Sequence, residues 1–306
     1  MTLPSAVRIR EVGPRDGFQN EPERISTDDK VRLIDALART GLRRLEVTSF
    51  VRADVVPQLA DAREVLERID VPAGVERSVL IPNARGLDAA LEAREHFDGV
   101  SVFLSASETH NRENVNRTVA ESLDQLRHVL SRAADAGLHR TAVIATSFGC
   151  PYEGEVPEAR VSSIARELHD AGAEEIGFGD TTGMANPLQV ARFFTRATQE
   201  LGGDVELTAH FHNTRGQGLA NVLAALQAGC TSFESSFGEL GGCPVPAGAT
   251  GNVATEDLVS MLHEMGVQTG VDLAKLLDAA RDVAGVLGRP LGSHTLVAGP
   301  VDWRRG

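Results

Sequence analysis

The sequence predicts one (β/α)8 barrel, a TIM barrel, followed by a helical C-terminal extension. Three observations support this fold class: eight short apolar runs, turns and helical patterns between them, and a length of 306 residues, which suits a barrel built as one unit. The strand-like runs cover residues 8–12, 44–48, 76–81, 99–104, 141–146, 175–178, 206–212 and 231–235. Strict alternation implies parallel strands with right-handed crossovers, and eight such strands close most naturally into a barrel.

The stretches between the runs have the character of helices. Residues 27–37, for example, begin with a capping residue and carry apolar positions at helical spacing. Glycines mark helix ends at Gly41, Gly137, Gly172 and Gly229. After about residue 250 only helical patterns follow, at 255–266 and 272–287. We therefore expect a catalytic barrel at 1–250 and a helical extension packed on it at 251–306.

A doubly wound open sheet is the alternative fold for alternating strands and helices. The G-x-G-x-x-G turn of dinucleotide-binding sheets is absent after the first strand. This absence disfavours a Rossmann fold and leaves other open sheets as the remaining alternative.

Composition excludes several classes of partner. The formal net charge is −13, spread along the chain, which disfavours nucleic acid and anionic membrane surfaces. No apolar run approaches the roughly 20 residues of a membrane span, and residues 1–6 lack the pattern of a signal peptide. The sequence therefore predicts a cytoplasmic protein.

Cysteine and lysine usage bear on the chemistry. The three cysteines, Cys150, Cys230 and Cys243, are too few for a secreted disulfide framework, so reduced thiols are expected. The only lysines, Lys30 and Lys275, fall in helical patterns. A Schiff-base aldolase needs a lysine on a barrel strand, so that mechanism is disfavoured.

Two strand ends together predict a metal site. His210 and His212 are two residues apart in a strand-like run, so both imidazoles lie on the same side of the strand. Arg15 and Asp16 follow the first strand directly, where it gives way to a loop. If these ends meet, two imidazole nitrogens and one carboxylate oxygen are available to a divalent cation.

Other strand ends also carry polar residues, as the active face of a TIM barrel requires. Among them are Glu46 and Asp180, which we take as catalytic candidates together with Arg15 and His210. Each has a structural alternative: an ion pair for Glu46 and a helix cap for Asp180. Cys243 lies in a loop rich in glycine and proline, where a thiol contributes little to packing, so we take it as a further catalytic candidate.

Eight collinear motifs resemble the hydroxymethylglutaryl-CoA lyase family over residues 7–293. They begin at Glu11, Glu46, Gly149, Gly179, His210, Gly216, Leu240 and Gly251, and read EVGPRDGFQNE, EVTSF, GCPYEG, GDTTG, HFHNT, GQGLAN, LGGCP and GNVATED. Any one of these motifs is weak, but eight in the same order are specific.

The resemblance implies a TIM barrel that binds Mg2+ or Mn2+ and cleaves a 3-hydroxyacyl-CoA to acetyl-CoA and a keto acid by a retro-Claisen step, as in leucine degradation. It places the metal on Asp16, His210 and His212, with Asn252 in or near the coordination shell. It also implies catalytic roles for the candidates already selected: Arg15, Glu46, Asp180, His210 and Cys243.

Departures from the family pattern leave the substrate open. The family usually has Asp where this chain has Asn213 and Tyr where it has Arg215, and the loop after Cys243 differs as well. Hydroxymethylglutaryl-CoA, citramalyl-CoA and a longer branched hydroxyacyl-CoA are all candidates. A Claisen-type synthase that condenses acetyl-CoA is the rival reaction, a hydrolase and a metal-binding scaffold are the other rivals, and a homodimer is expected.

Overall fold

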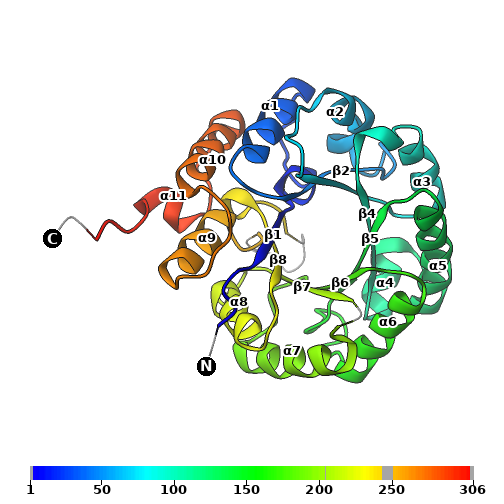
Figure 1. Cartoon of the computed structure of the whole chain (residues 1–306). Helices are drawn as coiled ribbons and strands as arrows, with labels where there is room; N and C mark the ends of the chain where they lie inside the picture. Colours follow the sequence, from blue (N-terminus) through cyan, green and yellow to red (C-terminus); the bar gives the residue numbers. More distant parts are fainter. Residues whose placement is uncertain (1–2, 204, 243–250, 304–306) are drawn as a thin grey trace.

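Eight parallel strands form the centre of the molecule. The computed structural model describes residues 3–203, 205–242 and 251–303. The strands close into a barrel in the order β1 to β8, so the predicted TIM barrel is confirmed (Figure 1). They are β1 Arg8–Glu11, β2 Arg44–Ser49, β3 Glu76–Leu80, β4 Gly99–Ser105, β5 His139–Ala145, β6 Glu175–Asp180, β7 Glu206–Phe211 and β8 Ser232–Ser235. Their ends lie within two residues of the predicted runs.

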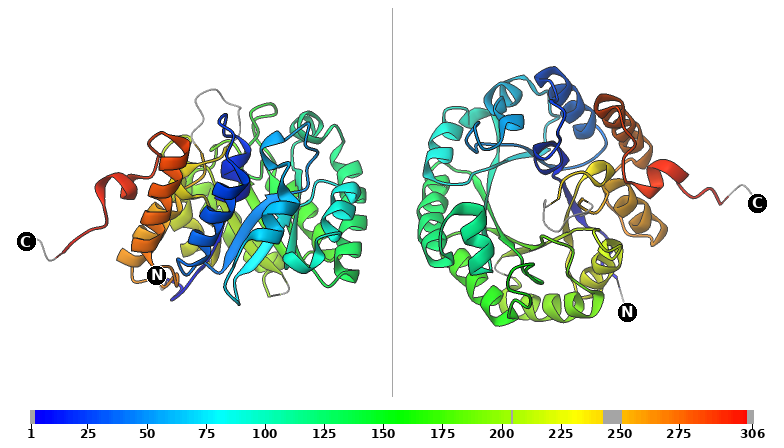
Figure 2. Two further views of the ribbon diagram at one scale, coloured as in Figure 1. Left: turned by 90° about the horizontal axis from the view of Figure 1, so that it is seen from above. Right: turned by 180° about the vertical axis from the view of Figure 1, so that it is seen from behind.

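A ring of helices surrounds the barrel (Figures 1 and 2). The helices that follow β1 to β7 are α1 Thr27–Ala38, α2 Ala62–Arg68, α3 Ala84–Leu91, α4 Glu108–Val115, α5 Val119–Asp135, α6 Glu158–Asp170, α7 Pro187–Leu201 and α8 Gly218–Gln227. Side-chain caps begin several of them; the Ser26 side chain, for example, accepts the backbone N–H of Asp29 at the start of α1. In the described part of the chain, no helix has both the length and the apolar character of a bilayer span.

The C-terminal helices are α9 Thr255–Glu264, α10 Leu273–Leu287 and α11 His294–Ala298. Helices α9 and α10 stand in the outer ring between α8 and α1, and α10 contacts α1 (Figures 1 and 2). The chain after α11 extends away from the barrel. The division into a barrel at 1–250 and an extension at 251–306 stays a prediction.

The apolar core lies between the strands and the helices. On β6, for example, the Phe178 ring lies 4.9 Å from the Phe193 ring and 5.9 Å from the Phe194 ring, both on α7, measured between centroids. The inward positions of β6 carry Gly177 and Gly179, which have no side chain. The barrel is therefore fixed by packing on its outer face, while its interior has room for polar groups at the carboxyl ends of the strands.

Candidate active site

A cavity of about 620 Å3 opens at the carboxyl ends of the strands. Its volume lies in the usual range for a small-molecule site. Polar and charged residues from strand ends around the barrel line it, among them Arg15, Asp16, Glu46, His210, His212 and Glu234. Five of these six are residues that the sequence selected, so the predicted convergence of the strand ends is observed.

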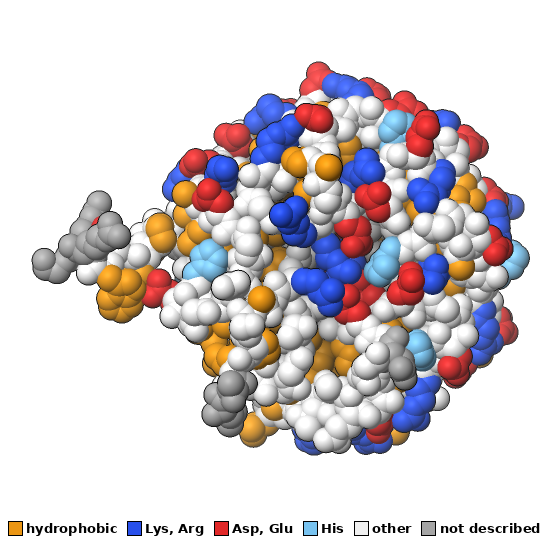
Figure 3. Space-filling view, viewed as in Figure 1, with side chains coloured by type: hydrophobic (Ala, Val, Ile, Leu, Met, Phe, Trp, Pro, Cys, Tyr) orange, Lys and Arg blue, Asp and Glu red, His pale blue; other side chains and the backbone are white. Residues whose placement is uncertain are grey.

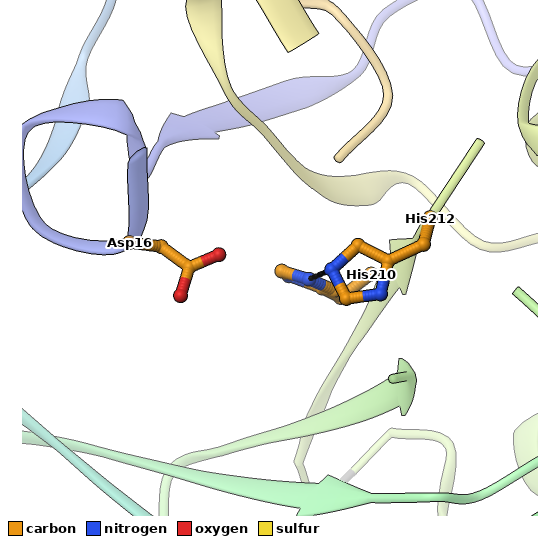
Figure 4. A group of neighbouring side chains, drawn as sticks. All are labelled: Asp16, His210 and His212. Carbon is orange, nitrogen blue, oxygen red and sulfur yellow. Dashed lines mark hydrogen bonds between the residues drawn. The ribbon is translucent and has the colours of Figure 1, made fainter. Parts of the chain in front are cut away.

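Asp16, His210 and His212 come together in this cavity. One ligand atom from each lies within 4.8 Å of the other two, and the Nε2 atoms of the histidines are 3.4 Å apart. Figure 4 shows the Asp16 carboxylate pointing toward the two rings from the segment after β1, and the rings coming from the end of β7. One carboxylate and two imidazoles are a ligand set for a divalent cation.

The segment that carries Asp16 is a helical turn, η1 (Gly13–Gly17). The prediction of a loop directly after β1 is therefore wrong. The backbone N–H of Asp16 donates to the Val12 carbonyl at 2.7 Å, which turns the chain back over the end of β1. Gly13 is required here because a Cβ atom would lie 2.4 Å from the Phe237 ring. This close packing fixes the position of the Asp16 carboxylate above the barrel.

Hydrogen bonds at Nδ1 orient both histidines. His210 Nδ1 lies 2.9 Å from Glu234 Oε2, and His212 Nδ1 lies 2.6 Å from the Thr181 carbonyl oxygen. Both partners are acceptors, so each ring donates from Nδ1, and in the neutral form of the ring Nε2 keeps its lone pair. The two free nitrogens are the atoms nearest to each other, as a shared cation requires.

Asn252 supplies a further observation that fits a metal ion. Its amide nitrogen donates to Asp16 Oδ2 at 2.7 Å and to the Leu240 carbonyl at 2.9 Å. Its Oδ1 atom is buried and has no hydrogen-bond partner among the described residues. A buried oxygen without a donor is costly unless a cation or water satisfies it, so the donor set fits the expected metal.

The charge states of Asp16 and His212 agree with this arrangement. Burial opposes ionisation of Asp16, but the Arg15 guanidinium and the nearby imidazoles hold its pKa below the ordinary value. Burial, together with the neighbouring His210, lowers the pKa of His212 to about 4. Burial also lowers the pKa of His210, but its Glu234 partner outweighs that effect and raises it. The site thus holds an ionised carboxylate and a neutral His212 at pH 7.

Arg15 lies beside the ligand set and is held at two points. Its Nε atom donates to Glu46 Oε2 at 2.5 Å, and its Nη1 atom donates to Asp16 Oδ1 at 2.7 Å. Glu46 is 2% exposed, so the ion pair is largely screened from water. The guanidinium is therefore a fixed positive charge on the cavity wall next to the candidate cation.

The two remaining catalytic candidates are Asp180 and Cys243. Asp180 is buried and is not among the residues that line the cavity; its Oδ1 atom accepts the N–H groups of Met184 and Ala185 in the loop before α7. The N-cap of α7 is Asn186, so the helix-cap alternative for Asp180 is wrong. Its Oδ2 atom has no partner among the described residues, and burial raises its pKa to about 6. Cys243 lies outside the described residues. Catalytic roles for both stay predictions.

Glu234 was passed over as a functional residue. It belongs to the last predicted strand, and the structure places it against His210 and on the cavity wall. A signal was present: Glu234 and His210 are charged or polar residues on neighbouring predicted strands. Only the register of β7 on β8, which pairs these two residues, shows that they meet.

The fold and the site define a TIM-barrel protein with a candidate divalent-metal site at the carboxyl ends of its strands. The family model described as HMGL-like matches residues 6–283. The hydroxymethylglutaryl-CoA lyase of Bacillus subtilis is 46% identical over 296 residues, covering 97% of this chain and 98% of that one. The chain belongs to the HMGL-like family, so the predicted family is confirmed.

A further relative and two solved structures also carry the name of this lyase, and the relative's name includes a second substrate. A Pseudomonas aeruginosa relative named 3-hydroxy-3-isohexenylglutaryl-CoA/hydroxymethylglutaryl-CoA lyase is 41% identical over 298 residues, covering 97% of this chain and 98% of that one. The crystal structure of the Bacillus subtilis HMG-CoA lyase superposes with a TM-score of 0.93, covering 97% of this chain and 99% of that one at 46% identity. The Acinetobacter baumannii HMG-CoA lyase, solved with coenzyme A and 3-methylmalate, has a TM-score of 0.92 at 40% identity and covers 98% and 97% of the two chains.

Proposed function

We propose that this protein is a hydroxymethylglutaryl-CoA lyase that releases acetyl-CoA and acetoacetate. The observation that carries the proposal is the assembly of Asp16, His210 and His212, with Arg15 beside them, in one cavity. The lyase activity predicted from the sequence agrees with the names of relatives that are 41–46% identical over nearly the whole chain. The cation is Mg2+ or Mn2+.

A bound divalent cation would supply a Lewis acid that lowers the cost of removing the proton from the substrate hydroxyl before the carbon–carbon bond breaks. Asp16, His210 and His212 would hold the ion, with Asn252 Oδ1 as a fourth ligand. The chain's own part is to keep these four groups in place. The contacts from Asn252 to Asp16 and from Glu234 to His210 do this.

Arg15 would stabilise the other product of bond breaking. The electron pair of the broken bond passes to the thioester as an enolate, and a fixed guanidinium near the thioester oxygen stabilises this negative charge. Glu46 and Asp16 restrain Arg15, so little reorganisation is needed during the reaction. Arginine also stays charged at every working pH.

Two proton transfers complete the balance of the reaction. A base takes the proton of the substrate hydroxyl, and an acid gives a proton to the enolate carbon to form acetyl-CoA. We assign the base to Asp180 or His210 and the acid to Cys243. Of the two, His210 has no free nitrogen while it ligates the cation through Nε2 and donates from Nδ1 to Glu234, whereas Asp180 Oδ2 has no hydrogen-bond partner among the described residues.

A longer acyl group is a second candidate substrate. The cavity wall includes the apolar side chains of Leu80, Phe103 and Val143, on the strands β3 to β5. These side chains can accommodate an alkyl chain in place of a methyl group. The name of the Pseudomonas aeruginosa relative includes such a substrate, an isohexenylglutaryl thioester.

The test is a coupled assay that follows acetyl-CoA release from hydroxymethylglutaryl-CoA, with and without Mg2+. We expect release that stops after exhaustive chelation and returns with Mg2+ or Mn2+. The isohexenyl thioester in the same assay tests the longer substrate. Consumption of acetyl-CoA with a keto acid, without cleavage in the other direction, would identify the rival synthase. Full activity after chelation would contradict the metal-dependent mechanism.

The remaining expectations concern the protein in the cell. A homodimer and a cytoplasmic location stay predictions. Sedimentation of the purified protein measures the first, and fractionation of the source cells measures the second.

A further inference from the structure

The barrel interior beneath the active site is filled by buried charges. Arg10 on β1 is 1% exposed, and its guanidinium donates to both carboxylate oxygens of Glu175 at 3.0 and 2.7 Å. Toward the amino ends of the strands this network continues through Arg44, Glu76 and Glu206. Over the centre of the barrel in Figure 3, basic and acidic side chains gather together.

Glu234 connects this network to the candidate metal site. Its Oε1 atom accepts from Arg10 Nη1 at 3.1 Å, and its Oε2 atom lies 2.9 Å from His210 Nδ1. The connection follows from strand register, because His210 on β7 is the direct partner of Glu234 on β8, and Glu234 is paired with Arg10 on β1. The three side chains therefore lie side by side on the inner face of adjacent strands.

The physical role of this arrangement follows from the cost of burial. Glu234 is 6% exposed, and a carboxylate at that depth is stable only with a positive or strongly donating partner. Arg10 is such a partner, and Glu175 in turn offsets much of the charge of Arg10. The second oxygen of Glu234 is thereby available, as an ionised acceptor, to the Nδ1–H group of His210.

We propose that Glu234, held by Arg10, is a positioning residue that sets the affinity of the site for its cation through His210. A carboxylate on the outer nitrogen of a ligating imidazole fixes the ring's orientation and tautomer and increases the basicity of the other nitrogen. The inference rests on the proposed metal site. Because Glu234 also lines the cavity, it could instead act directly on the substrate. The experiment below separates this direct role from the positioning role.

The experiment compares Glu234→Gln with Glu76→Gln by Mn2+ titration calorimetry of the purified, metal-free protein. Glu76 is the matched control because it contacts Arg10 and Arg44 in the same network but has no contact with His210 or His212 in the described structure. We expect the Mn2+ dissociation constant to rise about 10- to 100-fold in Glu234→Gln and to stay within about twofold in Glu76→Gln.

Two further measurements keep the inference falsifiable. The 15N shifts of the His210 ring in metal-free protein report the tautomer, and we expect the Nδ1–H form in the wild type and a mixture in Glu234→Gln. If Glu234→Gln does not fold by circular dichroism, Glu234→Asp keeps the charge at a shorter reach and is expected to show an intermediate loss of Mn2+ affinity.

Several outcomes would overturn the inference. Unchanged Mn2+ affinity in Glu234→Gln with lost turnover would assign Glu234 to the substrate instead. An equal loss of affinity in Glu76→Gln would assign the effect to the charge network as a whole. Both results require a wild type that binds Mn2+. A wild type that binds none would remove the proposed metal site first and this inference with it.

Discussion

Gly241→Ala is a sharp perturbation of the site that leaves every proposed ligand in the sequence. Gly241 has a φ of +88°, and a Cβ atom at this position would lie 2.6 Å from Asn252 Nδ2 and 2.8 Å from Asp16 Oδ2. The substitution thus combines backbone strain with a steric overlap at the contact that holds the Asp16 carboxylate.

The magnitude can be worked from these distances. A left-handed backbone costs an alanine roughly 1–2 kcal/mol. To reach an ordinary contact of 3.4 Å, the two polar groups must move by about 0.6–0.8 Å. Disturbing the contacts that hold a metal ligand typically costs about 10- to 100-fold in metal affinity, so we expect Mn2+ to bind more weakly by that factor.

Gly229→Ala is the matched control. Gly229 has a φ of +95° and no atom within 4 Å of the position that a Cβ would take, so it has the strain without the overlap. Urea unfolding should show Gly229→Ala less stable by roughly 1–2 kcal/mol, the strain alone, and Gly241→Ala less stable by at least that amount because of the overlap. Mn2+ titration should separate them. Equal Mn2+ affinity in the two variants would refute the reasoning.

Three further predictions concern stability and turnover. Glu239 accepts a hydrogen bond from the Asn213 amide, so Asn213→Asp sets two carboxylates against each other and should lower the free energy of unfolding at pH 8 by about 1–3 kcal/mol. Adding Glu239→Gly should restore the stability. A single variant as stable as the wild type would contradict this prediction. Burial raises the pKa of Glu11 to about 7 and of Glu256 to about 8, so the folded state retains protons that the unfolded chain has lost. Unfolding free energy should therefore fall as pH rises from about 6 to 8, and less steeply in Glu256→Gln; equal slopes would contradict it. Arg15→Gln should slow hydroxymethylglutaryl-CoA cleavage about 100- to 1,000-fold, and a loss below tenfold in the release assay would exclude the enolate role.

The barrel and much of the site could be predicted because both follow from periodicity. Strand-helix alternation fixes the topology, and residues at the carboxyl ends of parallel strands converge whatever the details of packing. His210 and His212 share a face by the strand period of two, and Asp16 follows another strand end. The approach of these three residues to within 4.8 Å of one another could therefore be expected without knowing the strand register.

What could not be predicted depends on register and side-chain direction. The contact of Glu234 with His210 requires the pairing of β7 and β8. The bonds from Met184 and Ala185 to Asp180 require the course of the loop after β6. The helical turn at η1 forms because the Val12 carbonyl accepts two backbone N–H groups. No local pattern in the sequence predicts these two hydrogen bonds. Asn252 was reached through the family resemblance alone, because it lies 40 residues beyond His212 in sequence.

The most direct test of the metal site is an anomalous difference map from crystals of the wild type equilibrated with Mn2+. We predict a single strong peak within about 2.0–2.2 Å of Asp16, His210 Nε2 and His212 Nε2. The absence of a peak among these three groups, with Mn2+ bound elsewhere on the protein or nowhere, would contradict the central claim.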